Sequence, residues 1–277
     1  MTTQVQSNSL LEGFQAGLPV RLIATLRNEL MTCDAAESVA AVVERNRNPK
    51  FDFLPVTGKE GSGRPPIIGL LEVAPFMAGK SPLGSVRESM HHLSEPYLVG
   101  ADSSTIDFVR HADELPFRLL VSGDEISGLV CLYDIQKLPA RAAIFAMVTS
   151  LEMKMSDVIR KEFPEKEQWL PLLSEQRREK VVREMAKAQE AGAFVDALLM
   201  TQFGDKATIL RKISLPASNG KLRDDMERIQ KLRDSLAHAN EYATTRDQAR
   251  KVCATVRLVD EWLRMLGSST AQIVRVV

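Results

Sequence analysis

The sequence lacks several features that would assign a class of protein directly. Aromatic residues make up only 5% of the 277 residues, which disfavours a β-sandwich or a large stacking surface. The three cysteines, Cys33, Cys131 and Cys253, lie far apart, so neither a disulfide framework nor a zinc cluster is expected. Apolar runs such as Ala142–Val148 are far shorter than the ~20 residues of a membrane span, and the start has no secretion signal. We therefore expect a cytoplasmic protein with no membrane partner and no metal.

Net charge is also missing, because 36 basic residues balance 36 acidic ones. The balance hides a division: residues 1–138 are net acidic, and residues 139–277 are net basic to the same extent. A mildly basic half tolerates a polyanion, although ordinary variation in surface charge explains it equally well. With 44% hydrophobic and 26% charged residues, the chain is expected to be globular, and its length favours two domains.

The first half contains an internal repeat. A helix is expected from Cys33 to Val43, with Asp34 as its N-cap, and the pattern returns in Ala101–Val109 with Asp102 in the equivalent place. Each helix is followed by two β-rich runs, which are Phe51–Gly58 and Ile67–Val73 in the first copy, and Phe117–Gly123 and Ile126–Ile135 in the second. The sequence therefore predicts two β-α-β-β units in tandem.

The links within the repeat differ. Gly and Pro make Gly58–Pro66 a loop, whereas Gly123–Glu125 predicts a tight hairpin. Glu72–Ser85, between the copies, contains two prolines and is expected to be a connector.

This repeat, together with the strand Gly128-Leu-Val-Cys-Leu-Tyr-Asp134, resembles a pair of cystathionine-β-synthase-like (CBS) domains over residues 18–138. The resemblance implies an adenine nucleotide in the cleft between the copies, with Asp134 on the ribose hydroxyls. It also implies that Cys131 stands where the family has a hydroxyl residue near the phosphate. The first copy has Glu72 and Pro75 at the matching positions, so its site is expected to be lost. The alternative is that Asp134 only caps a helix begun by Ile135 and that the module is a dimerisation scaffold.

From Pro139 onward, the apolar period changes from two to about 3.6, which predicts a helical bundle. Apart from a link at Phe163–Ser174 and a loop at Ser214–Gly220, we expect helices at 140–162, 175–191, 194–213 (with a break near Gly204), 222–242 and 245–266, the last ending at Gly267. The helix at 175–191 is a candidate to steer RNA through Arg177, Arg178, Lys180, Arg183 and Lys187. Its interleaved glutamates equally predict a solvent face with many salt bridges.

Within the expected helix 222–242 stands Arg233-Asp-Ser-Leu-Ala-His238. This Arg-x4-His string, preceded by Phe203–Leu210, resembles the signature of the HEPN superfamily over residues 139–267. The fold class we expect is thus an α+β CBS pair at 18–138 followed by an all-α HEPN-like bundle at 139–267. The resemblance implies RNA cleavage without a metal, by the Arg and His of two protomers that face each other across a homodimer.

The residue types suit that chemistry. Arg233 carries a permanent charge, and its guanidinium can donate two hydrogen bonds to phosphate oxygens. His238 can transfer a proton near neutral pH. On an ideal helix, Arg233 and His238 point about 140° apart, whereas Asp234 and His238 lie within about 40°, so Asp234 is expected to orient the imidazole. Glu241 and Tyr242 are weaker candidates for the same cleft. The alternative is that these are ordinary solvated or locally paired side chains.

The function expected from these patterns is a metal-independent RNA endonuclease of toxin or phage-defence type, regulated by an adenine nucleotide bound to the CBS pair. The runner-up is a non-catalytic nucleotide-binding regulatory protein whose bundle serves for dimerisation or partner binding.

Overall fold

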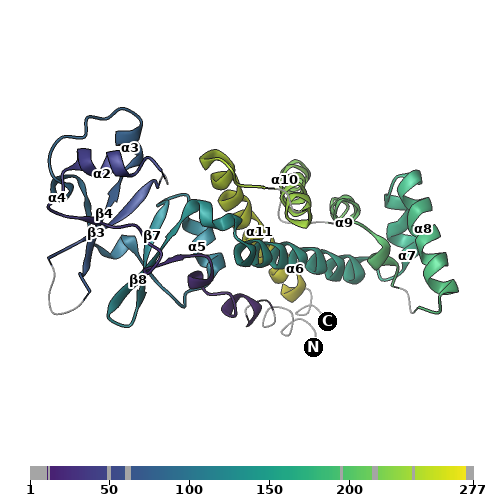
Figure 1. Cartoon of the computed structure of the whole chain (residues 1–277). Helices are drawn as coiled ribbons and strands as arrows, with labels where there is room; N and C mark the ends of the chain where they lie inside the picture. Colours follow the sequence, from purple (N-terminus) through teal and green to yellow (C-terminus); the bar gives the residue numbers. More distant parts are fainter. Residues whose placement is uncertain are drawn as a thin grey trace. The chain divides into compact units, whose positions relative to one another are not determined.

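The computed structural model describes residues 11, 13–48, 51–59, 64–193, 196–213, 218–238 and 241–272, with side chains up to Gly267. The chain divides into two compact units between Ala140 and Arg141. We call Phe14–Ala140 the N-terminal unit and the part from Arg141 onward the helical unit (Figure 1). Among the described residues, no helix is both long enough and apolar enough to cross a membrane.

The N-terminal unit contains two four-stranded sheets. The first has the order β1-β8-β7-β6, with strands Thr25–Leu26, Glu125–Cys131, Phe117–Ser122 and Leu98–Gly100. The second has the order β2-β3-β4-β5, with strands Cys33–Asp34, Phe53–Thr57, Ile67–Glu72 and His91–His92. The α+β class expected for this half is confirmed.

The predicted repeat is present in both sheets. In the first copy, β2 runs parallel to β3 and helix α2 (Val39–Arg45) connects them; in the second, β6 runs parallel to β7 through α5 (Thr105–His111). Each copy then closes with an antiparallel pair, β3–β4 or β7–β8. The tight β7–β8 hairpin is confirmed and turns at Gly123, whose φ of 62° suits glycine. The loop expected at Gly58–Pro66 lies partly outside the described residues.

The helix starts in the repeat differ from the prediction. Asp34 belongs to strand β2, and the N-caps are Ser38 and Ser104, whose hydroxyls accept the backbone N–H of Ala41 and Ile106. Asp34 instead bonds the N–H of Ala36 at 2.7 Å, in the turn between strand and helix. The helix is therefore shorter than expected because its first residues pair with β3.

The connector between the copies is partly helical. It holds a one-turn helix, α3 (Ala74–Met77), and is followed by α4 (Val86–Ser89) and by the 3-10 turn η2 (Glu95–Tyr97). Phe76 of α3 is 8% exposed and belongs to the first core of the unit. The expectation of a plain connector is wrong at this point, since Phe76 of α3 packs into that core.

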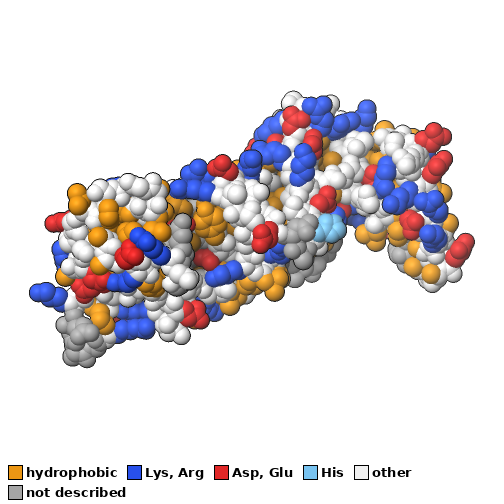
Figure 2. All heavy atoms as spheres, turned by 45° about the horizontal axis from the view of Figure 1, so that its top comes forward, with side chains coloured by type: hydrophobic (Ala, Val, Ile, Leu, Met, Phe, Trp, Pro, Cys, Tyr) orange, Lys and Arg blue, Asp and Glu red, His pale blue; other side chains and the backbone are white. Residues whose placement is uncertain are grey.

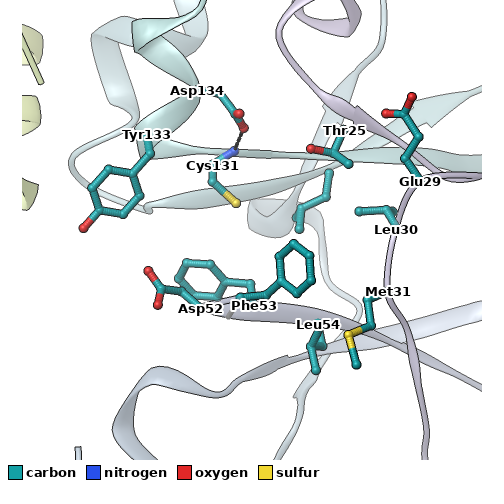
Figure 3. Close-up of a pocket in the computed structure, with 12 residues that line it drawn as sticks. Thr25, Glu29, Leu30, Met31, Asp52, Phe53, Leu54, Cys131, Tyr133 and Asp134 are labelled. Atoms are coloured by element: carbon teal, nitrogen blue, oxygen red, sulfur yellow. Dashed lines mark hydrogen bonds between the residues drawn. The ribbon is translucent and has the colours of Figure 1, made fainter. Parts of the chain in front are cut away.

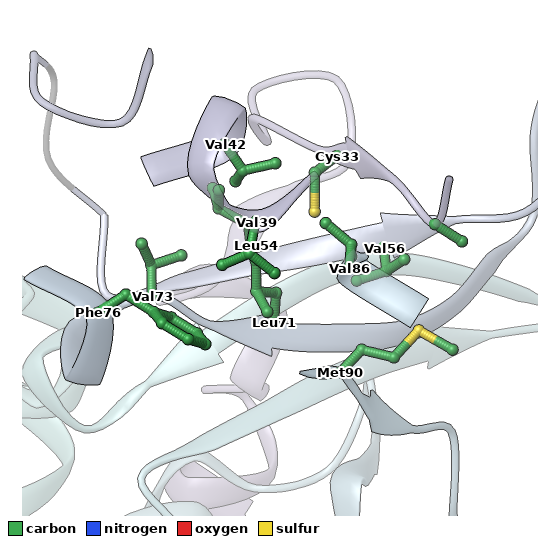
Figure 4. Close-up of a cluster of buried hydrophobic side chains, with 11 residues drawn as sticks. Cys33, Val39, Val42, Leu54, Val56, Leu71, Val73, Phe76, Val86 and Met90 are labelled. Carbon is green, nitrogen blue, oxygen red and sulfur yellow. The ribbon is translucent and has the colours of Figure 1, made fainter. Parts of the chain in front are cut away.

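Two apolar clusters stabilise the N-terminal unit. The first lies between the second sheet and its helices, and Figure 4 shows Val39, Val42, Leu54, Leu71 and Phe76 within it. The second joins the two sheets, because Ile67 and Leu70 of β4 pack with residues of β7 and β8. The inter-sheet members from that side are Phe117, Leu119 and Leu129. Burial of these side chains is the main term that holds the two copies together.

The helical unit matches the predicted class. Its main helices are α6 (Leu138–Glu162), α8 (Glu175–Glu190), α9 (Phe203–Leu210), α10 (Asn219–Ala237) and α11 (Arg246–Gln272). Shorter turns are the 3-10 segment η1 (Val20–Leu22) of the N-terminal unit, and α7 (Lys166–Trp169), η4 (Leu170–Leu172) and η5 (Ala197–Met200) of the helical unit. Helices α6 and α8 confirm the expected segments.

Several of the expected helix limits are wrong. The segment 194–213 is divided at Thr201 and Gln202 rather than near Gly204, and residues 194–195 lie outside the described part. Helix α10 ends at Ala237 instead of Tyr242. Helix α11 continues through Gly267, which acts as a helical residue and not as a stop.

Several buried polar contacts connect the helices of this unit. Trp262 of α11 is fully buried, and its Nε1 donates to Asp225 Oδ2 of α10 at 3.0 Å. Lys206 of α9 donates to Glu152 Oε1 of α6 at 2.9 Å, also from a buried position. Because an unpaired polar group in such a core costs free energy, these pairs fix how the helices meet.

Candidate functional site

A cavity of about 420 Å³ lies in the N-terminal unit. Its lining comes from β1, the segment after it, the start of β3, the end of β8 and the following 3-10 turn η3 (Leu132–Gln136). The lining residues are Thr25, Glu29, Leu30, Met31, Phe51, Asp52, Phe53, Leu54, Leu129, Cys131, Tyr133 and Asp134 (Figure 3). The cavity therefore uses strands from both copies of the repeat, and its size suits a small-molecule ligand.

Asp134 lines this cavity as the sequence predicted, but its carboxylate is already engaged. Its Oδ2 accepts the backbone N–H of Cys131 at 2.6 Å, and its Oδ1 pairs with Lys137 Nζ at 2.9 Å. Burial raises the pKa of Asp134, although the hydrogen bonds from Lys137 and Cys131 oppose that rise. Asp134 thus caps η3, which begins at Leu132 rather than at Ile135. Its contact with a ribose stays a prediction.

Cys131 ends β8, and Figure 3 shows its sulfur directed toward the cavity. Burial raises the pKa of the Cys131 thiol, and the charges of Asp134 and Asp52 raise it further. The thiol is therefore neutral at physiological pH and offers a ligand only a weak donor and a soft apolar contact.

The first copy presents different groups at the matching positions. Glu72 ends β4 as Cys131 ends β8, and Pro75 lies in α3 as Asp134 lies in η3. Glu72 Oε2 lies 3.8 Å from His91 Nε2, so this carboxylate is directed to a neighbouring strand. The equivalence of these positions supports the repeat alignment on which the sequence interpretation depended.

The sequence interpretation missed most of the cavity lining. Phe51, Asp52 and Phe53 come directly before and into strand β3, and Thr25 lies on the two-residue strand β1. The Phe-Asp-Phe string gave no signal of a site, because alternating apolar and polar residues are the ordinary pattern of a half-buried strand. Thr25 gave no signal either, since a two-residue strand has no periodicity.

In the helical unit, Arg233 and Asp234 are neighbours in space as well as in sequence. Arg233 Nη1 lies 3.2 Å from Asp234 Oδ1, and both side chains are partly exposed, at 39% and 49%. An ion pair with this exposure contributes little to stability. The two groups are therefore free to exchange partners when a ligand or a second protein approaches.

His238 does not stand on the helix as expected. Helix α10 ends at Ala237, and His238 is its C-cap with an extended backbone, φ −91° and ψ 139°. The His238 backbone N–H donates to the Asp234 carbonyl at 3.2 Å, while the Asp234 carboxylate turns to Arg233. The expected geometry, in which that carboxylate orients the imidazole within one helix, is thus not what the structure has. His238 itself is exposed.

Arg141 explains why the helix ends there. Its Nη1 donates to the carbonyls of Ser235, Leu236 and His238, at 3.3, 3.1 and 2.9 Å. A cation at this position satisfies the carbonyls that a helix C-terminus leaves open. Since Arg141 lies on α6, the end of α10 is held by a residue nearly one hundred positions earlier in the chain.

A groove runs between α10 and α11. Its volume is about 400 Å³, and its lining is Arg228, Lys231, Leu232, Ser235, Tyr242, Gln248, Lys251, Val252 and Thr255. Tyr242, named above as a weaker candidate, belongs to this groove and is 8% exposed; burial raises the pKa of its hydroxyl. Three cations and no carboxylate line the groove, which suits an anionic partner.

Three of the five basic side chains of helix α8 are near carboxylates. Arg177 is bound to the buried Asp205, with Nε 2.9 Å from Oδ1, and Lys187 and Arg183 both lie near Glu184. On the face shown in Figure 2, Lys and Arg side chains are likewise interspersed with Asp and Glu. The contacts of α8 favour the salt-bridge alternative for this helix over RNA steering.

Among the described residues, no group of three or more His, Cys, Asp or Glu side chains is placed to hold a metal ion. No family model matches the chain, and no curated protein matches it.

Part of the chain is similar to solved structures. The CBS domain of the bacterial CNNM/CorC family Mg2+ transporter in complex with ATP is 19% identical with a TM-score of 0.37, over 48% of this chain and 91% of that one. The same domain in complex with the inhibitor IGN95a is 17% identical with a TM-score of 0.38, over 50% of this chain and 86% of that one. A CBS domain-containing protein of unknown function from Bacillus anthracis is 15% identical with a TM-score of 0.37, over 46% of this chain and 95% of that one. At these identities and scores, the matches identify no activity for this chain.

Proposed function

We propose that the protein is a ligand-responsive regulatory protein whose N-terminal unit is a CBS-like pair that binds an adenine nucleoside or nucleotide. The observation that carries this proposal is the cavity of about 420 Å³ lined by β3 of one copy and β8 of the other. Aromatic and aliphatic side chains supply a surface for a planar base, and carboxylates can accept the hydrogen bonds of a ribose diol. Asp134 and Cys131 line this cavity, and the family resemblance implies a ribose beside Asp134 and a phosphate near Cys131.

The experiment is calorimetric titration with adenosine, AMP, ADP and ATP. Thr25→Trp places a large ring in the cavity and should abolish binding. Leu26→Trp is the matched control, because Leu26 is the next residue on β1, is 44% exposed and does not line the cavity. Binding that survives Thr25→Trp, or the absence of any binding by the wild type, contradicts the proposal.

A second candidate function is RNA cleavage by the helical unit. Its support is that Arg233 and the exposed His238 stand five residues apart at the end of α10, with the cation-lined groove on the same helix. In this proposal, a homodimer brings the Arg233 of one protomer to the His238 of the other, as in HEPN nucleases. Arg233 binds the phosphate, His238 transfers the proton, and Asp234 restrains Arg233. The cellular role that follows is a toxin or phage-defence effector.

The test is an RNA cleavage assay in EDTA that compares wild type with Arg233→Ala and His238→Ala. Cleavage by wild type alone, leaving 2′,3′-cyclic phosphate ends, supports the nuclease. Arg223→Ala serves as the control, since Arg223 is exposed near the other end of α10 and pairs only with its neighbour Asp224 among the described contacts. Equal cleavage by all variants contradicts the nuclease proposal, and so does the absence of cleavage by wild type with or without adenine nucleotides. In either case, the regulatory function is the candidate that remains.

A further inference from the structure

The charge of the N-terminal cavity is unusual for a site that would hold a phosphorylated ligand. Three of its lining residues are carboxylates, namely Glu29, Asp52 and Asp134, and none of the lining residues is Lys or Arg. In Figure 3, these carboxylates stand on different sides of the space, with Asp134 above, Glu29 to the right and Asp52 to the left. A phosphate bound in this cavity therefore finds no cation in the lining and lies near carboxylates.

Of the three negative charges, only that of Asp134 is balanced by a nearby cation among the described residues. Asp134 pairs with Lys137 at 2.9 Å, but within the described part of the chain neither Glu29 nor Asp52 has an ion-pair partner. The field of Asp52 reaches the cavity wall, because its charge is one of the causes that raise the pKa of the Cys131 thiol. Glu29 is exposed, whereas Asp52 is partly buried, and a partly buried charge is screened less by salt than a charge on an open surface.

The rest of the lining is apolar and aromatic. Phe53 is directed into the middle of the cavity, beside Leu54, Met31 and Leu30, and its ring packs 4.8 Å from that of Phe117. A ring fixed in this way offers a flat surface to a heterocycle, and aromatic faces together with carboxylates also attract cations. The combination fits a ligand with a planar base and no negative charge.

We propose that this cavity selects its nucleoside ligand by charge, so that it takes a purine nucleoside whose 5′ substituent is neutral or positive and rejects the 5′-phosphorylated form. This rests on the proposed function, since it names the chemical class of ligand for the same site. Glu29 and Asp52 are the residues that set the preference, whereas the charge of Asp134 is balanced by Lys137.

The test is calorimetric titration at one fixed ionic strength, in EDTA so that no metal masks a phosphate. The probes are 5′-amino-5′-deoxyadenosine, adenosine, AMP and ATP. We expect the amino compound to bind most tightly, adenosine next, and AMP at least about tenfold more weakly than the amino compound. The Glu29→Gln, Asp52→Asn double variant should reduce that ratio to near one. Asp124→Asn, in the exposed β7–β8 turn of the same unit, should leave it unchanged.

The outcomes separate the two proposals. If AMP or ATP binds more tightly than the amino compound at the site that Thr25→Trp blocks, selection by charge is overturned and nucleotide sensing stands. An unchanged ratio in the double variant likewise overturns the role of Glu29 and Asp52. If none of the four probes binds the wild type, the proposed function fails and the charge preference fails with it.

Discussion

Arg141 lies over the ring of Tyr242, with 4.8 Å between the guanidinium carbon and the ring centroid. The same guanidinium donates to the carbonyls at the end of α10, including that of His238. One side chain of α6 therefore holds both the last turn of α10 and the aromatic residue that follows it. The backbone of His238 is thus held from two sides, by Arg141 at its carbonyl and by the Asp234 carbonyl of α10 at its N–H.

Arg141→Ala should lower the free energy of unfolding of the helical unit by about 2 kcal/mol, because it removes a charged hydrogen-bond donor and a cation–π contact together. Urea unfolding followed by circular dichroism measures this. Arg250→Ala is the control: Arg250 is exposed on α11 with Asp247 4.0 Å away, and its loss should change stability by less than about 0.5 kcal/mol. Equal effects of the two variants would show that the Arg141 contact contributes nothing specific.

Gly128→Ala should destabilise the N-terminal unit by about 2 kcal/mol. A Cβ at this position would lie 2.7 Å from the carbonyl oxygen of Thr25, on the neighbouring strand β1. Gly69, at the matching place in the first copy, is just as confined, since its Cβ would lie 2.5 Å from the carbonyl oxygen of His91. Thermal unfolding of both variants measures the cost.

Gly220→Ala provides the opposite case within the same chain. Gly220 lies in the first turn of α10, and a Cβ there would meet nothing within 4 Å. The substitution should stabilise the helical unit by about 0.5 kcal/mol, because alanine loses less backbone entropy in a helix than glycine. A loss of stability comparable to that of Gly128→Ala would contradict the conclusion that a Cβ at position 220 meets no neighbouring atom.

The pair between Arg177 and Asp205 should make the helical unit sensitive to acid. Burial by itself would raise the pKa of Asp205, but the hydrogen bonds from Arg177 and from the Gln202 backbone outweigh it and hold the pKa below its ordinary value. A pKa lowered in the folded state contributes stability above the unfolded pKa of about 3.9 and loses it as the pH falls through the lower folded value.

Asp205→Asn should therefore destabilise by about 2 kcal/mol at pH 7, and the difference from wild type should shrink below about pH 4. Urea titrations at pH 7, 5 and 3 test this. Asp157→Asn removes an exposed ion pair with Arg160 and should cost less than about 0.5 kcal/mol at pH 7. A difference between Asp205→Asn and wild type that stayed constant down to pH 3 would be inconsistent with a carboxylate stabilised by Arg177.

The thiols should react slowly in the folded protein. Burial, together with the nearby Glu37, raises the pKa of Cys33 to about 12, burial also raises that of Cys131, and Cys253 is fully buried. Because the thiolate is the reactive form, a thiol reagent at pH 8 should label the native chain far more slowly than the chain in urea. Rapid labelling of all three thiols in the native protein would mean that these side chains are not buried.

Local patterns predicted the repeat and most helices well. The β7–β8 hairpin follows from glycine at Gly123, and α6 follows from apolar residues at helical spacing. These features depend on neighbours only a few positions away, so the sequence displays them directly. The residues at which the helices begin were harder to predict. Asp34 is a good N-cap residue by type, but it pairs with Thr57 in the sheet, and Ser38 is the N-cap instead.

The candidate sites show the same division. Asp134 was recognised as a residue of the cavity, whereas Phe53, Asp52 and Glu29 join it only because β3 and the segment after β1 lie beside the end of β8. His238 was identified by its spacing from Arg233, but its position depends on Arg141, which lies 97 residues earlier. Contacts over such separations leave no periodic trace in the chain.

By itself, the amino-acid sequence determined an α+β repeat followed by a helical bundle, because alternation, helical spacing and turn residues act over short distances. Only the tertiary structure decided that Asp134 caps a turn, that carboxylates surround the N-terminal cavity, and that α10 ends before His238. Each of these depends on which side chain or carbonyl, distant in the sequence, satisfies a polar group once the chain has packed. Such partners are brought together only by the complete fold.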